Sequence, residues 1–355
     1  MSRTLFNLHN LFLLIFTGFF ALMSCEGPKG PEGAIGPQGP QGPAGPSGAE
    51  QCGVCHNSTN ELIAKKDQWV ASKHATGHNF ERSTKECAPC HTSQGYIEVI
   101  GTGSLTTAAD IQDPVGQNCR TCHKIHTNYD STDWALRKTD ATKLQLTGEI
   151  VDFKKGNTCA QCHQARTAVM PDLAQETFAI TNTRWGPHHS TAANILAASG
   201  AVEISGSVAY TNTGHLQAIP KGCVSCHMAQ AYGSQAGGHS MWMSYDYHGS
   251  QVDNVVACKT CHSGLTKFDS KDQIITKTYS KLTDLRNKLA AAGILDTTQS
   301  NGSYASDILI KGTYSTKLAA AAWNYLFIVA DGSNGVHNPA YINAVLQNSI
   351  EAIGD

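Results

Sequence analysis

Apolar residues recur with helical spacing near the end of this 355-residue chain, where three helices are predicted. The first covers residues 270–292 and is expected to end at Gly293, because glycine readily adopts the left-handed conformation that closes helices. Such a helix buries its apolar face against other parts of the protein. The apolar positions near one face are Ile275, Leu282, Leu285 and Leu289.

The other two helices are predicted at roughly 314–330 and at 339–353. The earlier one is rich in alanine, which permits the close approach of a partner helix. The later one has Asn338 as its N-cap and Pro339 in its first turn. Residues 266–355 are therefore predicted to form a helical region that packs on the rest of the protein. The apolar positions of the last helix are Ile342, Val345, Leu346, Ile350 and Ile353.

A continuous apolar run lies close to the N-terminus, between Arg3 and Cys25. It is short for a membrane span and follows a positive charge, so residues 1–24 are predicted to be an export signal. The ending LMSC resembles the lipobox of bacterial lipoproteins, in which the cysteine is lipidated after cleavage. An ordinary signal peptide or a retained anchor is the alternative. We expect Cys25 to be lipidated and the protein to be exported.

Glycine occupies every third position from Gly27 to Gly48, in a stretch that is rich in proline. This is the collagen pattern, because only glycine fits the crowded axis of the triple helix. Residues 25–51 are thus predicted to be a lipidated, collagen-like stalk, either trimeric or a single stiff strand. At roughly 3 Å per residue, the repeat would span about 70 Å.

The composition of the chain points to chemistry based on cysteine and histidine. A net charge of −2 gives no support for nucleic acid as a partner. The chain has 13 cysteines and 16 histidines, while aromatic residues make up only 7%. A chain of this length with so few aromatic residues is expected to fill part of its interior with something other than side chains.

Six copies of C-x-x-C-H, the attachment signature of c-type haem, follow the stalk. On a helical turn, positions i, i+3 and i+4 share one face, so both sulfurs reach one porphyrin and the histidine reaches its iron. The cysteines are Cys52, Cys55, Cys87, Cys90, Cys119, Cys122, Cys159, Cys162, Cys223, Cys226, Cys258 and Cys261. The histidines are His56, His91, His123, His163, His227 and His262.

Three alternative interpretations leave these histidines unexplained. Zinc knuckles and disulfide frameworks use paired cysteines but do not require histidine after every pair. Thioredoxin-like sites do not occur in sixes. If Cys25 is lipidated, the other twelve cysteines all belong to the motifs. Six covalently bound haem c groups are therefore predicted.

The predicted fold is mainly α-helical with little regular sheet, and haems form much of its core. Residues 52–265 are expected to be the hexahaem domain. Within it, 92–118 and 200–222 are rich in small polar residues and are predicted to pack against porphyrins.

Several segments that contain further histidines resemble multihaem c-type cytochromes, in particular the group of pentahaem nitrite reductases and octahaem hydroxylamine oxidoreductases. The resemblance covers roughly residues 52–355. The segments are 69–78, 119–126, 184–190, 213–228, 236–242 and 331–346. In these families a histidine from each such segment is a distal ligand of a haem bound elsewhere. The resemblance implies the distal set His74, His126, His188, His215, His239 and His337.

Some of these assignments have competitors. His78 competes with His74, and His189 with His188; the first of each pair is preferred by resemblance. His248 has no assigned iron and is expected to lie near a haem propionate.

The chain also departs from the enzymes that it resembles. Ammonia-forming nitrite reductases usually have one C-x-x-C-K motif, whose iron is open to substrate, whereas all six motifs here end in histidine. We therefore expect an electron-transfer protein of the cell envelope, without catalytic residues. A reductase of small substrates at one open haem, or a subunit of a conducting filament, is the alternative.

The expected partners are redox proteins or an extracellular acceptor. If the stalk is trimeric, two further copies of the chain are partners as well. The residue after Cys25 is Glu26 and not the aspartate that often retains lipoproteins at the inner membrane, so the outer membrane is favoured.

Overall fold

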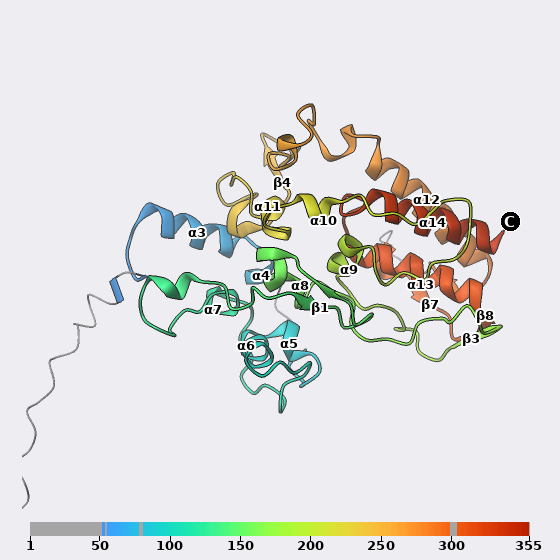
Figure 1. The fold of residues 1–355 in the computed structure, drawn as a ribbon, viewed down its shortest axis with the longest axis horizontal. Coiled ribbons are helices and arrows are strands. Elements are labelled where there is room, and N and C mark those ends of the chain that lie inside the picture. Colours follow the sequence, from blue (N-terminus) through green and yellow to red (C-terminus); the bar gives the residue numbers. More distant parts are fainter. Residues whose placement is uncertain (1–51, 54, 78–80, 299–303, 355) are drawn as a thin grey trace, which may run out of the picture. The chain divides into compact units, whose positions relative to one another are not determined.

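The computed structural model describes residues 52–53, 55–77, 81–298 and 304–354 (Figure 1). These residues all fall within one compact unit. The predicted export signal, Cys25, the collagen-like repeat and His78 lie outside the described residues. The fold is mainly helical, as predicted, and most of its helices are short.

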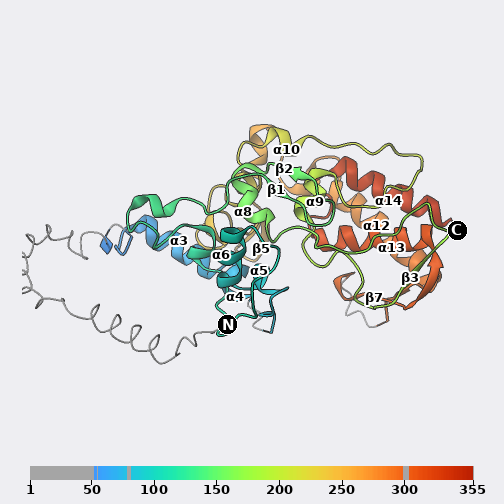
Figure 2. The same ribbon diagram turned by 60° about the horizontal axis from the view of Figure 1, so that its bottom comes forward.

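Three long helices form the largest apolar core, and both ribbon views show them side by side (Figures 1 and 2). They are α12 (Ile274–Ala291), α13 (Thr316–Asp331) and α14 (Pro339–Ile353). Leu282, Leu285 and Leu289 of α12 are buried in this core together with Trp323 and Leu346. In the part of the chain that the structure describes, no helix combines the length and apolarity that crossing a membrane requires.

The ends of these helices can be compared with the sequence predictions. The predictions for α13 and α14 are confirmed, including the cap of α14, where the Asn338 side chain accepts from the Tyr341 N–H. The predicted end of α12 at Gly293 is also confirmed, with φ of +71°. Its predicted start at residue 270 is wrong, because the backbone of Gln273 is left-handed and α12 begins only after it.

The remaining helices are short because several consist of one C-x-x-C-H turn or of the turn that carries another histidine. α6 was not predicted as a helix. It packs against α5, and only glycine fits at position 95, since a Cβ there would lie 2.3 Å from Ala88 O. The helices are α3 (Asn60–Val70), α4 (Lys73–Thr76), α5 (Ala88–His91), α6 (Ser93–Thr102), α7 (Cys119–Cys122), α8 (Asn157–Ala160), α9 (Ala192–Ala197), α10 (His215–Ala218) and α11 (Cys223–His227). Short 3₁₀ helices are η1 (Ser131–Trp134), η2 (Lys154–Gly156), η3 (Gly238–Ser240), η4 (Cys258–Thr260), η5 (Phe268–Ser270) and η6 (Tyr304–Ser306).

Regular sheet is sparse, as predicted, and the described strands pair as four two-stranded antiparallel ribbons. One ribbon is a hairpin whose tight turn is formed by His248 and Gly249, both with positive φ. The pairs are β1 (Thr142–Lys143) with β2 (Ile150–Val151), β3 (Thr177–Ile180) with β8 (Gly312–Ser315), β4 (Ser244–Tyr247) with β5 (Ser250–Asp253), and β6 (Leu295–Asp296) with β7 (Ile308–Leu309).

Candidate haem-binding sites

Each C-x-x-C-H motif forms one helical turn. In five motifs the backbone N–H of the histidine donates to the carbonyl of the first cysteine, over 2.6–3.2 Å. The remaining motif forms the whole of α11, Cys223–His227. This conformation places both sulfurs and the ring on one side of the turn, as attachment to a single porphyrin requires.

Contacts between motif cysteines bring different motifs together. Cys90 lies within hydrogen-bonding reach of Cys162, whose Sγ is also 3.8 Å from Pro89 O. Cys159 and Cys223 form a second such contact. The motif at 159–163 therefore lies between the motifs at 87–91 and 223–227.

Every motif histidine faces one other histidine ring. The two rings of each pair come from different parts of the chain, and their centres are separated by nearly the same distance in all six pairs. The ring-centre distances are 6.3 Å for His56–His126, 6.0 Å for His74–His163, 6.5 Å for His91–His188, 6.3 Å for His123–His239, 6.4 Å for His215–His262 and 6.2 Å for His227–His337.

This spacing matches the geometry of one iron between two imidazoles. A histidine nitrogen binds a transition metal at about 2 Å and lies roughly 1 Å from the centre of its ring, so coaxial ligands have ring centres about 6 Å apart. Two protein ligands per site is also the number that a porphyrin iron accepts. By contrast, no cluster of three or more metal-ligating side chains is found among the described residues. The side chains present therefore fit haem c.

Hydrogen bonds at Nδ1 orient several of these rings. His123 Nδ1 lies 2.6 Å from Trp134 O, and His163 Nδ1 lies 2.6 Å from Ser190 Oγ. An Nδ1–H donated to oxygen fixes the tautomer that leaves Nε2 free for a metal. The other contacts at Nδ1 are His215 with His337 O, His227 with Met241 O and His337 with Asp331 Oδ1.

Desolvation by the surrounding protein atoms favours the neutral form of most of these rings, which is the form that binds metal. It lowers the pKa of His163 to about 4, with smaller contributions from neighbouring histidines. Burial and then Arg166 lower the pKa of His188 to about 4. The pKa of His337 moves the other way: burial opposes the charged ring, but the Asp331 carboxylate outweighs it and raises the pKa. Burial is also the main cause of lowered pKa values at His74, His91, His227 and His239.

His126 is held by an unusual loop just after its own motif. Its backbone is left-handed, with φ of +65°. The next three backbone N–H groups, of residues 127–129, donate to the buried carboxylate of Asp133 over 2.8–3.2 Å. This turns the His126 ring away from His123 and toward His56, so two motifs meet at residues 123–126.

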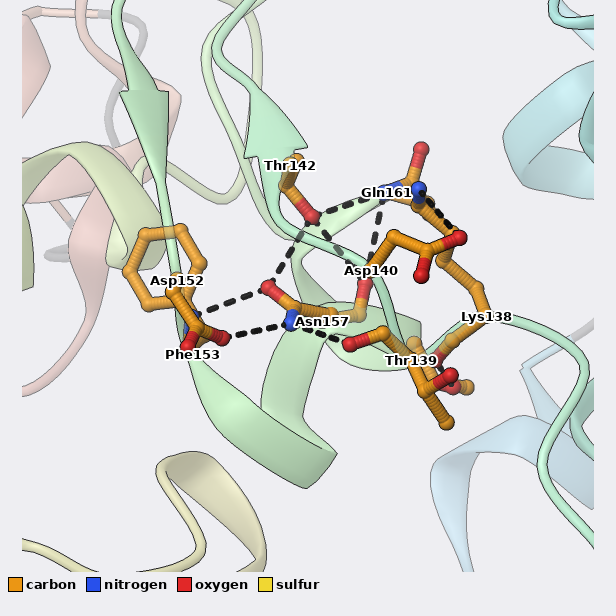
Figure 3. Close-up of polar contacts among 9 residues, drawn as sticks. Lys138, Thr139, Asp140, Thr142, Asp152, Phe153, Asn157 and Gln161 are labelled. Carbon is orange, nitrogen blue, oxygen red and sulfur yellow. Dashed lines mark hydrogen bonds and ion pairs between the residues drawn. The ribbon is translucent and has the colours of Figure 1, made fainter.

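A buried polar network supports the motif at 159–163 (Figure 3). Asn157, which is fully buried, donates to Thr139 O and to Asp152 Oδ1, each over 2.9 Å. Its Oδ1 accepts from the Phe153 N–H over 2.9 Å. Gln161, inside the motif, donates to Thr142 Oγ1 over 2.8 Å. These bonds fix the start of α8, which carries Cys159.

The competing histidines have other surroundings. His189 lies beside His188, with 4.9 Å between ring centres. His248 stacks edge-on against Tyr247 at the tip of its hairpin. Neither forms a ring pair with a motif histidine in the described structure, and the assignments of all twelve histidines as ligands stay predictions.

Asp331 was not among the site residues predicted from the sequence. The available signal was its position six residues before His337, at the expected end of a helix, where a carboxylate is unfavourable beside the helix dipole. A carboxylate at such a position needs a compensating contact, and for Asp331 this contact is the His337 ring.

The chain is similar in part to known proteins. The sequence pattern of the cytochrome c552 family matches residues 206–355. A cytochrome c-552 from Maridesulfovibrio salexigens is 29% identical over 135 residues, which is 33% of this chain and 27% of the relative. The solved structure of the outer cell wall cytochrome OcwA aligns with a TM-score of 0.48 and 20% identity, covering 82% of this chain and 50% of that chain.

The matched parts of the chain span only about a quarter of the curated relative and half of the solved structure. The six C-x-x-C-H turns and the cytochrome c552 match together support a multihaem c-type cytochrome as the class of this protein.

Proposed function

We propose that this chain is an exported, lipid-anchored hexahaem cytochrome that relays electrons in a bacterial cell envelope. The observation that carries the proposal is the set of six histidine pairs with ring centres 6.0–6.5 Å apart. An iron held by two histidines has no position left for a substrate and exchanges only electrons. This favours a relay over a reductase.

Haem, when bound, supplies a one-electron couple between ferric and ferrous iron. The residues of this chain would attach it through twelve thioether bonds and orient two imidazoles at each of six irons. The Nδ1 contacts with carbonyl or carboxylate oxygens described above keep Nε2 available at four of these twelve rings.

Contacts between sites support a relay. The thiol contacts link the motif at 159–163 to those at 87–91 and 223–227. His215, which faces His262, lies with its Nδ1 3.3 Å from the backbone oxygen of His337, which faces His227. Neighbouring sites that share backbone segments keep porphyrins close, as electron hopping requires.

The distribution of buried apolar side chains also supports haem as core material. Among the described residues of 52–143, the buried apolar side chains are Ala88, Pro89 and Tyr96, whereas α13 alone buries most of its length. A segment of that size does not fold around three apolar side chains. Covalently attached porphyrins would supply the missing apolar area.

Export and anchoring are proposed from the sequence alone. The apolar run before Cys25 and the collagen-like repeat after it would place the cytochrome away from a lipid surface, with the outer membrane favoured. Redox proteins or an extracellular acceptor, and a homotrimer through the repeat, are the partners that we propose.

The test uses the full chain produced in a host that matures c-type cytochromes. We expect a mass and a pyridine haemochrome count that correspond to six haems, and a variant lacking Cys258 and Cys261 should bind five. Electron paramagnetic resonance of the oxidised protein should show only low-spin iron, and carbon monoxide should not bind after reduction. One high-spin iron that binds carbon monoxide or turns over nitrite would overturn the relay in favour of a reductase.

A further inference from the structure

One ring pair differs from the others in its contact with a buried carboxylate. Asp331 Oδ1 lies 2.6 Å from Nδ1 of His337, and the Asp331 side chain is 0% exposed. His337 faces His227, and His227 itself bonds through Nδ1 to a neutral acceptor, Met241 O, over 3.1 Å. Among the described contacts of the other rings, the partners at Nδ1 are backbone or hydroxyl oxygens.

The loop between α13 and α14 holds this carboxylate in place. α13 ends at Asp331, and Gly332 reverses the chain with φ of +69°. The Ser333 hydroxyl donates to Asp331 Oδ2 and accepts from the His337 N–H over 3.3 Å. Gly335 packs so closely on α12 that a Cβ would lie 2.4 Å from Thr278 Oγ1. The carboxylate and the ring therefore meet in a loop that is fixed from both sides.

The physical effect of such a bond is well defined. A carboxylate that accepts Nδ1–H draws the proton toward itself and makes the imidazole a stronger, more anionic donor to its metal. Negative charge near iron stabilises the ferric state relative to the ferrous state, and burial strengthens this effect because little water screens it. The reduction potential of the site is lowered as a result.

We propose that Asp331 is a positioning residue that lowers the reduction potential of the haem held by Cys223, Cys226, His227 and His337. This inference rests on the proposed function, since it needs haem at this motif. It goes beyond that function by distinguishing one carrier from the other five. Electrons would leave this haem more readily than they would if His337 had a neutral partner.

The test is Asp331→Asn, which keeps an oxygen near Nδ1 and removes the charge. Loss of such a partner changes metal-site equilibria about 10–100-fold, and each tenfold corresponds to about 59 mV for a one-electron couple. In a potentiometric titration of the whole protein, the midpoint potential of one of the six one-electron components should rise. The rise should correspond to at least a tenfold change in its ferric–ferrous equilibrium. The electron paramagnetic resonance signal of one low-spin haem should change with it.

Two further variants separate this effect from a general loss of stability. Asp307→Asn removes another fully buried carboxylate, whose partners are Arg286 and Tyr325 and not a histidine ring. It should reduce stability and leave the titration unchanged. Ser333→Ala removes a hydrogen-bond donor to Asp331, so the carboxylate charge acts more strongly on His337. The midpoint potential of the same component should therefore fall.

The outcomes distinguish the two proposals. Six unchanged midpoints in Asp331→Asn, with six low-spin haems retained, would overturn the role of Asp331 and leave the relay intact. Fewer than six haems in the unsubstituted protein would overturn the hexahaem function itself. If Asp331→Asn does not fold, the Ser333→Ala titration decides, and an unchanged or raised midpoint there contradicts the inference.

Discussion

The sites at His91–His188 and His227–His337 have nearly equal ring spacing, 6.5 and 6.2 Å, but opposite electrical surroundings. After burial, Arg166 and Arg82 are among the causes that lower the pKa of His188. A buried carboxylate instead raises the pKa of His337. Axial ligands thus define what chemistry a site can do, whereas neighbouring charge sets how readily it gives up an electron.

The largest expected effect comes from removing one ring from each site. His337→Ala should leave one iron with a single histidine, and carbon monoxide difference spectra should show one reactive haem among six. His188→Ala should give a smaller signal, because His189 lies 4.9 Å away on the same loop and can replace the lost ring. Equal signals from the two variants, or a double His188→Ala/His189→Ala variant without a larger signal, would contradict this difference.

The second prediction concerns the scaffold that lies between the two sites. Asn157→Ala leaves buried partners of the amide, such as the Phe153 N–H, without a hydrogen bond. Each buried unsatisfied group costs about 1–3 kcal/mol, so the free energy of unfolding should fall by about that amount. Urea unfolding followed at the haem absorbance measures it.

The matched control for that variant is Asn182→Ala, which alters an exposed asparagine whose side chain accepts a local hydrogen bond from Arg184 N. It should change the free energy of unfolding by less than about 0.5 kcal/mol. A similar loss in both variants would mean that the Asn157 network does not support the motif at 159–163.

The third prediction sharpens the electrical contrast. Replacing both Arg82 and Arg166 by Gln removes positive charge near His188, so the ferric state is favoured and one midpoint should move downward, opposite to Asp331→Asn. Both arginines are exposed, and an exposed charge is worth about 0.2–1 kcal/mol, so each arginine should shift the equilibrium at most about fivefold.

High salt should abolish the difference between this variant and the unsubstituted protein, because screening weakens exposed charges far more than buried ones. The exposed Lys311, between β7 and β8, provides a control in Lys311→Gln. A shift that persists at high salt, or that Lys311→Gln reproduces, would contradict the assignment to Arg82 and Arg166.

The smallest expected effect is a dependence of stability on acid pH. The Lys154 side chain, followed by Asn157, lowers the pKa of Asp152 from 3.8 to about 2. A carboxylate with a lowered pKa stabilises the fold above pH 3.8, and this contribution is lost as the pH falls from 3.8 toward 2. The difference in Tm between the unsubstituted protein and Asp152→Asn should therefore shrink over that range, as calorimetry would show. A difference that stays constant from pH 5 to pH 2 would exclude Asp152.

Local features of the fold could be predicted from the sequence because their causes are local. The C-x-x-C-H turn has only three residues between the first cysteine and the histidine, and the motif turns are helical as expected. The end of α12 and the cap of α14 also follow from single residues, Gly293 and Asn338. α6 was missed because its glycine serves a contact with α5 that no helix propensity reveals.

The partner of each ring could not be predicted, because it depends on contacts between distant segments. The sequence offered His74 as a ligand but gave no reason why it should face His163, far along the chain, and not the motif next to it. His126 follows one motif and faces another because Asp133 turns its loop. The resemblance supplied six candidate rings, and the tertiary structure supplied six pairings.

The sequence by itself determined how many C-x-x-C-H motifs there are and which atoms they offer, since a covalent signature is written in adjacent residues. Only the tertiary structure decided which rings meet and what charge stands behind them. The hydrogen bond from His337 to Asp331 forms because α13 ends, the chain reverses and α14 begins within a few residues. The packing of the two helices fixes this geometry.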